Sequence, residues 1–188
     1  MIEGVSEITT LGSKVVYENR WMKVREDTIE RRDGSKGIYG VVEKPDFVVI
    51  VPVEDNGSMH LVEQYRYPVG GRFWEFPQGS WENAPFASPL EVARGELREE
   101  TGLDAAKMTY AGYMFQGYGY ATQGGHVFLA QTLRAGEQAL DHEEHGLVTR
   151  LFSPDALVSM IQSGEIKDAM TIAALGLLHI KGLLQPHL

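Results

Sequence analysis

Three glutamates in one short stretch are the residues of this chain with the clearest potential for chemistry. Glu96 and Glu100 are four residues apart and Glu99 lies beside them. In a helix, side chains at this spacing are neighbours, with Cβ atoms roughly 5–6 Å apart. Carboxylates held that close repel each other, and a hard divalent cation relieves the repulsion because it takes their oxygens as ligands. The spacing therefore indicates a site for Mg²⁺ or Mn²⁺.

The sequence also marks the ends of the helix that would position these acids. Ser88, followed by proline and then by Glu91, forms a capping box at the start. Gly102 is expected to end the helix, because glycine adopts the left-handed conformation at little cost. The three-and-four spacing predicts one apolar stripe, bordered by the first and last of the three glutamates, and made of Leu90, Ala93, Leu97 and Thr101.

An acidic helix face exposed to solvent is the alternative explanation for these residues. Glutamate and arginine are common in helices, so the run Glu-Leu-Arg-Glu-Glu at 96–100 does not by itself distinguish the two. The order of the surrounding features favours chemistry. A glycine follows an aromatic strand, a loop leads into a capped helix with three acids, and Thr-Gly-Leu follows at 101–103.

This ordered set resembles the signature box of the Nudix hydrolases, which cleave nucleoside diphosphates linked to another moiety. The family pattern is glycine, five residues, glutamate, seven residues, arginine-glutamate, an aliphatic, any residue, two glutamates, any residue, glycine and an aliphatic. Gly79 fits the opening glycine if the loop holds two extra residues. The residues that match in place are Glu96, Leu97, Glu99, Glu100, Gly102 and Leu103.

Two positions depart from the family pattern. Ala87 stands where the family has its first glutamate, and Gly95 stands where it has arginine. The family's arginine can pair with the acid that is Glu99 here, and a glycine inside a helix costs about 1 kcal/mol relative to alanine. These departures leave an alternative function open, namely a nucleotide-binding regulatory protein of the same fold with weakened catalysis.

Most of the chain, from about residue 15 to 180, is similar to the branch of the family that hydrolyses ADP-ribose and related nucleotide sugars. Segments 63–68, 74–79 and 163–169 carry this likeness. The resemblance implies an α+β fold, with a Nudix-type α/β/α sandwich and mixed sheet over 46–188. It also implies a small antiparallel sheet over 1–45, which two subunits of a homodimer exchange.

The resemblance assigns the metal to four residues: Gln78, through its backbone carbonyl, Glu96, Glu99 and Glu100. Glu99 is also implied as a catalytic residue. The general base is expected in the acidic cluster 141–145, with Glu143 preferred and Glu144 second. A zinc site on His142 and His145 is a weaker explanation of that cluster, because the usual His-Glu-x-x-His spacing and thiols are both lacking.

Substrate contacts are implied for Trp21, Arg66 and Glu75. Trp21 would stack on the base, although an interface tryptophan would look the same in sequence. Arg66 ends a strand and offers a planar fork for phosphate oxygens, the alternative being a surface ion pair. The expected reaction is hydrolysis of the pyrophosphate bond of a nucleotide sugar, ADP-ribose first, giving a nucleoside monophosphate and a sugar phosphate. No proline follows the box within 117–120, where that branch usually has one, which leaves other nucleotide sugars open.

Composition excludes several other classes of protein. The 188 residues carry a formal net charge of −9, which argues against a nucleic-acid or anionic-membrane surface. There are no cysteines, so disulfides, thiolate zinc sites and thiolate catalysis are excluded. Neither a signal peptide nor an apolar run long enough to cross a bilayer is visible. We therefore expect a cytoplasmic enzyme.

The remaining elements follow from hydrophobic periodicity. The glycine-rich segment 117–125 predicts a hairpin loop and not a dinucleotide loop, because a strand and no helix follows it. Strands are predicted within 13–43 as an antiparallel sheet, and then at 47–53, 60–66, 72–76, 108–116, 126–130 and 147–152. Further helices are predicted from Ser153 to Gly164 and from Asp168 to Leu184.

Overall fold

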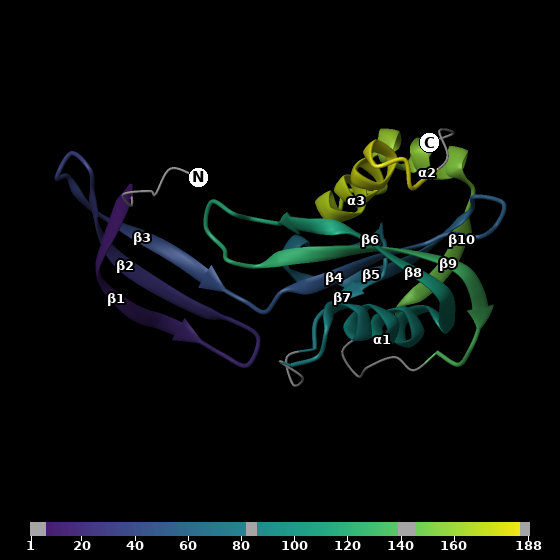
Figure 1. The fold of residues 1–188 in the computed structure, drawn as a ribbon, viewed down its shortest axis with the longest axis horizontal. Coiled ribbons are helices and arrows are strands. Elements are labelled where there is room, and N and C mark those ends of the chain that lie inside the picture. Colours follow the sequence, from purple (N-terminus) through teal and green to yellow (C-terminus); the bar gives the residue numbers. More distant parts are fainter. Residues whose placement is uncertain (1–6, 82–85, 139–145, 185–188) are drawn as a thin grey trace. The chain divides into compact units, whose positions relative to one another are not determined.

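The protein is described by a computed structural model that covers residues 7–81, 86–138 and 146–184. The chain divides into two compact units (Figure 1). The first contains the described residues up to Pro45 together with Phe115–Gly124. The second contains Asp46–Met114 and the described residues from Gly125 onward.

The first unit is an antiparallel sheet of three strands in the order β1-β2-β3. These strands are β1 (Ile8–Glu18), β2 (Lys23–Arg31) and β3 (Lys36–Glu43). The predicted sheet is confirmed, and β1 begins earlier than the expected residue 13. Gly34, with φ of +80°, makes the predicted turn between β2 and β3.

A distant segment completes the first unit. The Val42 N–H donates to the Tyr120 carbonyl at 2.8 Å, and the Thr122 N–H donates to the Val42 carbonyl at 3.0 Å. The Gln123 side chain donates to the Pro45 carbonyl at 2.7 Å. The loop between β8 (Leu103–Phe115) and β9 (Gly124–Ala135) therefore belongs with β3, which no local sequence pattern predicted.

The second unit contains a mixed sheet in the order β7-β4-β9-β8. Its central strand β4 (Phe47–Pro52) runs parallel to β9 and antiparallel to β7 (Gln78–Gly79). Every residue of β4 is buried, as its continuous apolar sequence predicted. An antiparallel sheet of the same unit contains β10 (Val148–Phe152), β5 (Met59–Arg66) and β6 (Gly71–Glu75), in that order, and the 3₁₀ turn η1 (Tyr67–Val69) joins β5 to β6.

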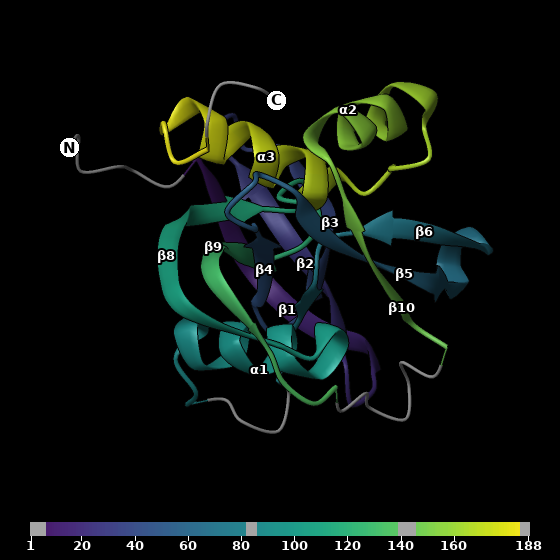
Figure 2. The same ribbon diagram turned by 90° about the vertical axis from the view of Figure 1, so that its right-hand side faces the viewer.

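Helices cover both faces of the mixed sheet (Figures 1 and 2). Val48 and Ile50 of β4 pack in one cluster with residues of α1 (Pro89–Thr101). Val49 and Val51 point the other way, into a cluster with α3 (Ala169–Ile180), because successive side chains of a strand alternate between faces. The α2 helix (Pro154–Ser163) precedes α3. The expected α+β architecture, with helices on both sides of a mixed sheet, is confirmed.

Helix α1 begins and ends where the sequence predicted. Both hydrogen bonds of the Ser88–Glu91 capping box are present, and Gly102 adopts φ of +69°. Its buried face is rotated from the predicted one, because Leu90 is 41% exposed whereas Val92 is buried. This rotation turns the first and last of the three glutamates into the buried face instead of along its border.

Helix α3 ends at Ile180, four residues before the predicted end. The chain cannot continue as a helix there because Gly182 has φ of +65°, in the left-handed region. Within the described part of the chain, none of the helices has the length and apolar character needed to cross a membrane.

Candidate active site

The carboxylate of Glu96 lies against the backbone of strand β7. Glu96 is 4% exposed, and a Cβ built on Gly79 would stand 2.4 Å from its Oε2 and 2.5 Å from its Oε1. Atoms cannot approach that closely, so the carboxylate occupies space that only a glycine leaves open. The opening glycine of the box therefore has a steric role beside the first of the three acids.

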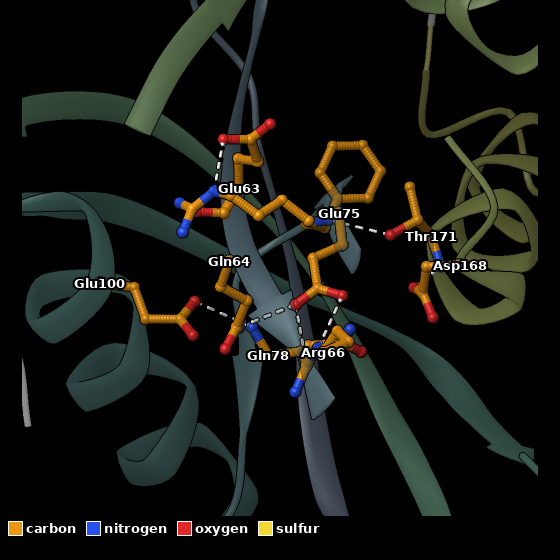
Figure 3. A network of polar contacts seen from close by, with 10 residues as sticks. Glu63, Gln64, Arg66, Glu75, Gln78, Glu100, Asp168 and Thr171 are labelled. Carbon is orange, nitrogen blue, oxygen red and sulfur yellow. Dashed lines mark hydrogen bonds and ion pairs between the residues drawn. The ribbon is translucent and has the colours of Figure 1, made fainter. Parts of the chain in front are cut away.

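The carboxylate of Glu100 lies one residue away along the same strand. Glu100 is 1% exposed, and its Oε2 accepts the Gln78 N–H at 3.1 Å (Figure 3). Because Gln78 and Gly79 are consecutive, the two carboxylates border neighbouring residues of β7. The helix thus places both buried acids beside Gln78 or its neighbour Gly79. The backbone carbonyl of Gln78 was expected to bind the metal together with these acids.

Two side chains hold the C-terminal end of α1. The backbone carbonyl of Glu100 accepts hydrogen bonds from the Gln138 side chain at 2.5 Å and from the Thr149 hydroxyl at 3.0 Å. The last carbonyls of a helix have no partner within the helix. These two donors fix the turn that carries Glu100, and no pattern in the sequence indicated either of them.

The donor set suits a hard divalent cation. The two buried carboxylates supply oxygens only, which Mg²⁺ and Mn²⁺ prefer. Glu99 is half-buried. Across the three described ranges, no three acidic or histidine side chains are grouped so that they could hold an ion by themselves. Within the described residues, Glu96 and Glu100 are the two acids of α1 that contact strand β7.

Arg66 and Glu75 form an ion pair between strands β5 and β6 (Figure 3). The Glu75 carboxylate is almost fully buried, and it accepts from Arg66 Nε at 3.1 Å, from Arg66 Nη2 and from Gln64 Nε2 at 2.8 Å. Burial raises the pKa of Glu75, the nearby Arg66 charge offsets part of the rise, and Asp168 adds to it. The Arg66 side chain is 39% exposed, so the guanidinium is held from one side and reaches solvent on the other.

The chain between β6 and β7 is fastened to helix α3. The Phe76 N–H donates to the Thr171 hydroxyl at 2.9 Å, and Thr171 is fully buried. Asp168 caps this helix by accepting from the Thr171 N–H at 2.7 Å. The link fixes the segment that carries Glu75 and Gln78. The capping acid gave a sequence signal for the helix start, but nothing indicated the bond across to Phe76.

Trp21 lies in the tight turn between β1 and β2 of the first unit. The Asn19 side chain accepts the N–H groups of Trp21 and Met22, each at 2.9 Å, and so shapes the turn. Trp21 is 42% exposed, with the Arg20 guanidinium 4.0 Å from the centre of its ring. An open pocket of about 290 Å³ is lined by Trp21 and by Glu18, Asn19, Arg20, Met22, Lys23, Glu43, Lys44 and Pro45.

Comparison with known proteins decides the family. Residues 43–175 match the NUDIX domain, and residues 8–42 match the nucleoside diphosphate sugar hydrolase N-terminal domain. The chain belongs to the Nudix family. The ADP-ribose pyrophosphatase of Bacillus subtilis (strain 168) is 30% identical over 181 residues, which is 95% of this chain and 96% of that protein.

Two further comparisons agree with this assignment. The ADP-ribose pyrophosphatase of Mycobacterium tuberculosis (strain ATCC 25618 / H37Rv) is 30% identical over 183 residues, covering 96% of this chain and 88% of that protein. A crystal structure described as an ADP compounds hydrolase superimposes with a TM-score of 0.82 at 22% identity, over 96% of this chain and 98% of that one. At that identity the superposition shows the Nudix fold alone.

The expected general base of this Nudix protein falls outside the described residues. Glu143 and Glu144, with His142 and His145 of the alternative zinc site, belong to the stretch 139–145 that the structure does not describe. Gly146, the first described residue after this stretch, is bound to strand β6: its carbonyl accepts a hydrogen bond from Arg72 Nη2 at 2.6 Å. The identity of the base therefore stays a prediction.

The two departures from the Nudix box have different surroundings. Ala87 packs against the apolar cluster beneath α1. Gly95 faces the ring of Trp81, which lies just after β7 and was not singled out from the sequence. The missing side chain at position 95 and the large ring at position 81 are complementary in size. This contact could have been suggested from sequence only by considering the two positions together.

Proposed function

We propose that this Nudix protein hydrolyses the pyrophosphate bond of a nucleoside diphosphate sugar in the presence of Mg²⁺ or Mn²⁺. ADP-ribose is the first candidate substrate, with a nucleoside monophosphate and a sugar phosphate as products. The observation that carries the proposal is the pair of buried carboxylates, Glu96 and Glu100, beside consecutive residues of β7. The names of the two ADP-ribose pyrophosphatases that are 30% identical support the substrate.

The proposed metal ligands are Glu96, Glu100 and the carbonyl of Gln78, with Glu99 as a further acid. A diphosphate resists attack because its negative charge repels nucleophiles. When bound, a divalent cation would neutralise phosphate oxygens and activate water for in-line attack. The protein's own part is to keep two carboxylates buried and oriented, through Gly79 on one side and the Gln78 N–H on the other.

Arg66 is proposed to bind a phosphate group of the substrate, with Glu75 orienting it. A guanidinium carries N–H groups in a fixed plane. Two of its nitrogens, Nε and Nη2, face Glu75, so the exposed remainder of the group can meet an anion. Glu75 acts on the substrate through this orientation, because its own carboxylate is only 2% exposed.

Trp21 is proposed to stack on the base of the nucleotide. One face of the indole is covered by Arg20, which leaves the opposite face for a base. The pocket beside it contains the cations Arg20, Lys23 and Lys44 and the acids Glu18 and Glu43, and Lys23 pairs with Glu18 at 3.3 Å. Stacking on an aromatic ring tolerates different bases, so this contact supports nucleotide binding more than a particular base.

A homodimer is proposed from the exposure of strand β1. All eleven of its residues are exposed, although the strand carries large apolar side chains on both faces. A sheet of three strands needs a covered apolar face to be stable, and exposed apolar surface of this kind marks interfaces. A second copy of the chain is the proposed cover for Ile8, Leu11, Val15, Val16 and Tyr17.

The general base is proposed to be Glu143, with Glu144 as the second choice. Water attacking a phosphate must lose a proton, and a carboxylate near the attacked phosphorus can accept it. Each of the variants Glu143→Gln and Glu144→Gln removes one such acceptor while keeping the size of the side chain. The base is the residue whose variant lowers kcat and leaves Mn²⁺ binding unchanged.

A panel of nucleotide sugars, with and without Mg²⁺ or Mn²⁺, tests the proposed function. We expect metal-dependent release of a nucleoside monophosphate from at least one member, ADP-ribose first. Tight binding of a nucleotide sugar without turnover would instead support the rival function, a regulatory protein whose catalysis is weakened at Ala87 and Gly95. Neither binding nor turnover across the panel would contradict both.

A further inference from the structure

The ring of Trp81 fills the space where residue 95 would have a side chain. A Cβ built on Gly95 would stand 1.9 Å from Cζ2, 2.6 Å from Cη2 and 3.0 Å from Cε2 of the indole. As long as Trp81 keeps this position, only a glycine fits at position 95 of the helix. The indole is also packed against the apolar cluster beneath α1, which includes Val92 and Leu97.

Trp81 adds a further contact between segment 78–81 and helix α1. The Gln78 N–H meets Glu100, the Gly79 backbone meets Glu96, and the Trp81 ring meets Gly95. The first two contacts involve backbone atoms of the segment, whereas Trp81 contributes a large apolar side chain. Trp81 is half-buried, and aromatic rings contribute much of the energy of such packing. The tryptophan is therefore well placed to determine how closely segment 78–81 lies against α1.

We propose that Trp81 is a positioning residue for Glu96 and Glu100. The missing side chain of Gly95 leaves the space that the Trp81 ring occupies. The inference rests on the proposed function, in which those two carboxylates bind the metal. A shift of segment 78–81 away from α1 would move Gly79 off one carboxylate and the Gln78 N–H off the other. Packing of Trp81 on Gly95 would thus hold segment 78–81 against the acidic helix, at the position where the family pattern has arginine.

The test is a double-mutant cycle between positions 81 and 95, with Mn²⁺ affinity of the substrate-free protein as the readout. Gly95→Ala places a methyl group inside the indole, so we expect Mn²⁺ affinity to fall roughly tenfold or more, as for other residues that orient metal ligands. In the Trp81→Ala background the same substitution meets open space, and we expect no further loss. Trp81→Phe keeps an apolar ring and should fall between Trp81→Ala and the unaltered protein.

Gly176→Ala is the matched control. Gly176 also lies inside a helix, α3, and nothing stands within 4 Å of a Cβ built on it. Both glycine-to-alanine changes improve helix propensity equally, but only Gly95→Ala brings a clash with Trp81. The control should leave Mn²⁺ affinity unchanged. Urea unfolding of every variant reports on stability in parallel, and Trp81→Phe provides the readout if Trp81→Ala does not fold.

Three results would overturn the inference. One is additive loss of Mn²⁺ affinity in the double variant, which would mean that the two positions act independently. Another is a lower urea midpoint with unchanged Mn²⁺ affinity, which would make the pair structural alone. The third is absence of Mn²⁺ binding by the unaltered protein. If positions 81 and 95 are coupled in Mn²⁺ affinity but no nucleotide sugar is turned over, the proposed function is wrong and the positioning role stands. If a nucleotide sugar is turned over but the two positions are not coupled, the proposed function stands and the positioning role is wrong.

Discussion

Glu96 and Gly79 are in such close contact that the carboxylate of one occupies the space of the absent side chain of the other. A Cβ at position 79 would stand 2.4 Å from Glu96 Oε2. The contact ties the first metal-binding candidate on α1 to the strand that carries Gln78. The position of a buried acid in this protein is therefore set by a residue that has no side chain.

Gly79→Ala is expected to displace the Glu96 carboxylate. The added methyl group and the carboxylate cannot share the same space, so metal affinity and turnover should both fall, by roughly 10–100-fold. Gly119→Ala is the control, because a Cβ there meets nothing within 4 Å. Mn²⁺ titration followed by steady-state kinetics measures both effects. Unchanged affinity in Gly79→Ala would show that Glu96 does not bind the metal in its present position.

Arg66→Ala is expected to destabilise the protein by about 1–3 kcal/mol, because it leaves the buried Glu75 carboxylate without its guanidinium. In the Glu75→Gln background the same change should cost less, since a neutral amide needs no counter-charge. Urea unfolding of the four proteins gives the coupling. Arg98→Ala, which breaks an exposed pair with Asp104, serves as comparison and should cost no more than about 1 kcal/mol. Equal costs of Arg66→Ala in both backgrounds would refute the ion pair.

The raised pKa of Glu75 predicts a specific pH dependence of stability. In the unfolded chain this carboxyl titrates near its ordinary value of 4.5, whereas burial makes the folded protein hold the proton to higher pH. Between those two values the folded state binds more protons, so the free energy of unfolding falls as pH rises through this window. Glu75→Gln removes the contribution. We expect the variant to lose less stability than the unaltered protein between pH 4.5 and neutral pH in urea unfolding. A pH profile identical to that of the unaltered protein would contradict the assigned cause.

Trp21→Ala is expected to raise KM for the nucleotide sugar much more than it lowers kcat. Loss of stacking on one base costs about 1–3 kcal/mol, which corresponds to a rise in KM of roughly 5- to 150-fold. Trp21→Phe retains an aromatic face and should preserve most of the affinity. Steady-state kinetics with the best substrate of the panel separates the two constants. An unchanged KM in Trp21→Ala would leave the residue with a packing role only.

The helix that carries the acids could be predicted from sequence because its signals are local. Ser88, Glu91 and Gly102 lie within one stretch, and each acts on backbone groups of its own or the next turn. The same holds for strand β4, because its continuous run of apolar residues predicts a buried strand without reference to distant parts of the chain. The rotation of the buried face of α1 was missed, since it depends on the surface against which the helix packs.

The partners of the site residues could not be predicted in the same way. Thr171 and Phe76 are 95 positions apart, and the Phe115–Gly124 segment joins β3 across a similar gap. No pattern of neighbouring residues encodes such contacts, because they arise only when the sheets are assembled. The indole over Gly95 is an intermediate case: the unusual glycine was visible in the sequence, and the residue that requires it was not.

Release of nucleoside monophosphate by the Glu100→Gln variant is the sharpest test of whether the paired carboxylates bind the metal. Glu100 is buried and lies beside Gln78. Glutamine has nearly the same shape as glutamate, so the variant removes the carboxylate with little change in packing. Glu165→Gln, at an exposed position after α2, is the control and should behave as the unaltered protein. With ADP-ribose and Mg²⁺ we predict that Glu100→Gln loses metal-dependent release while its fold is retained. Turnover equal to that of the unaltered protein would contradict the role of the paired carboxylates.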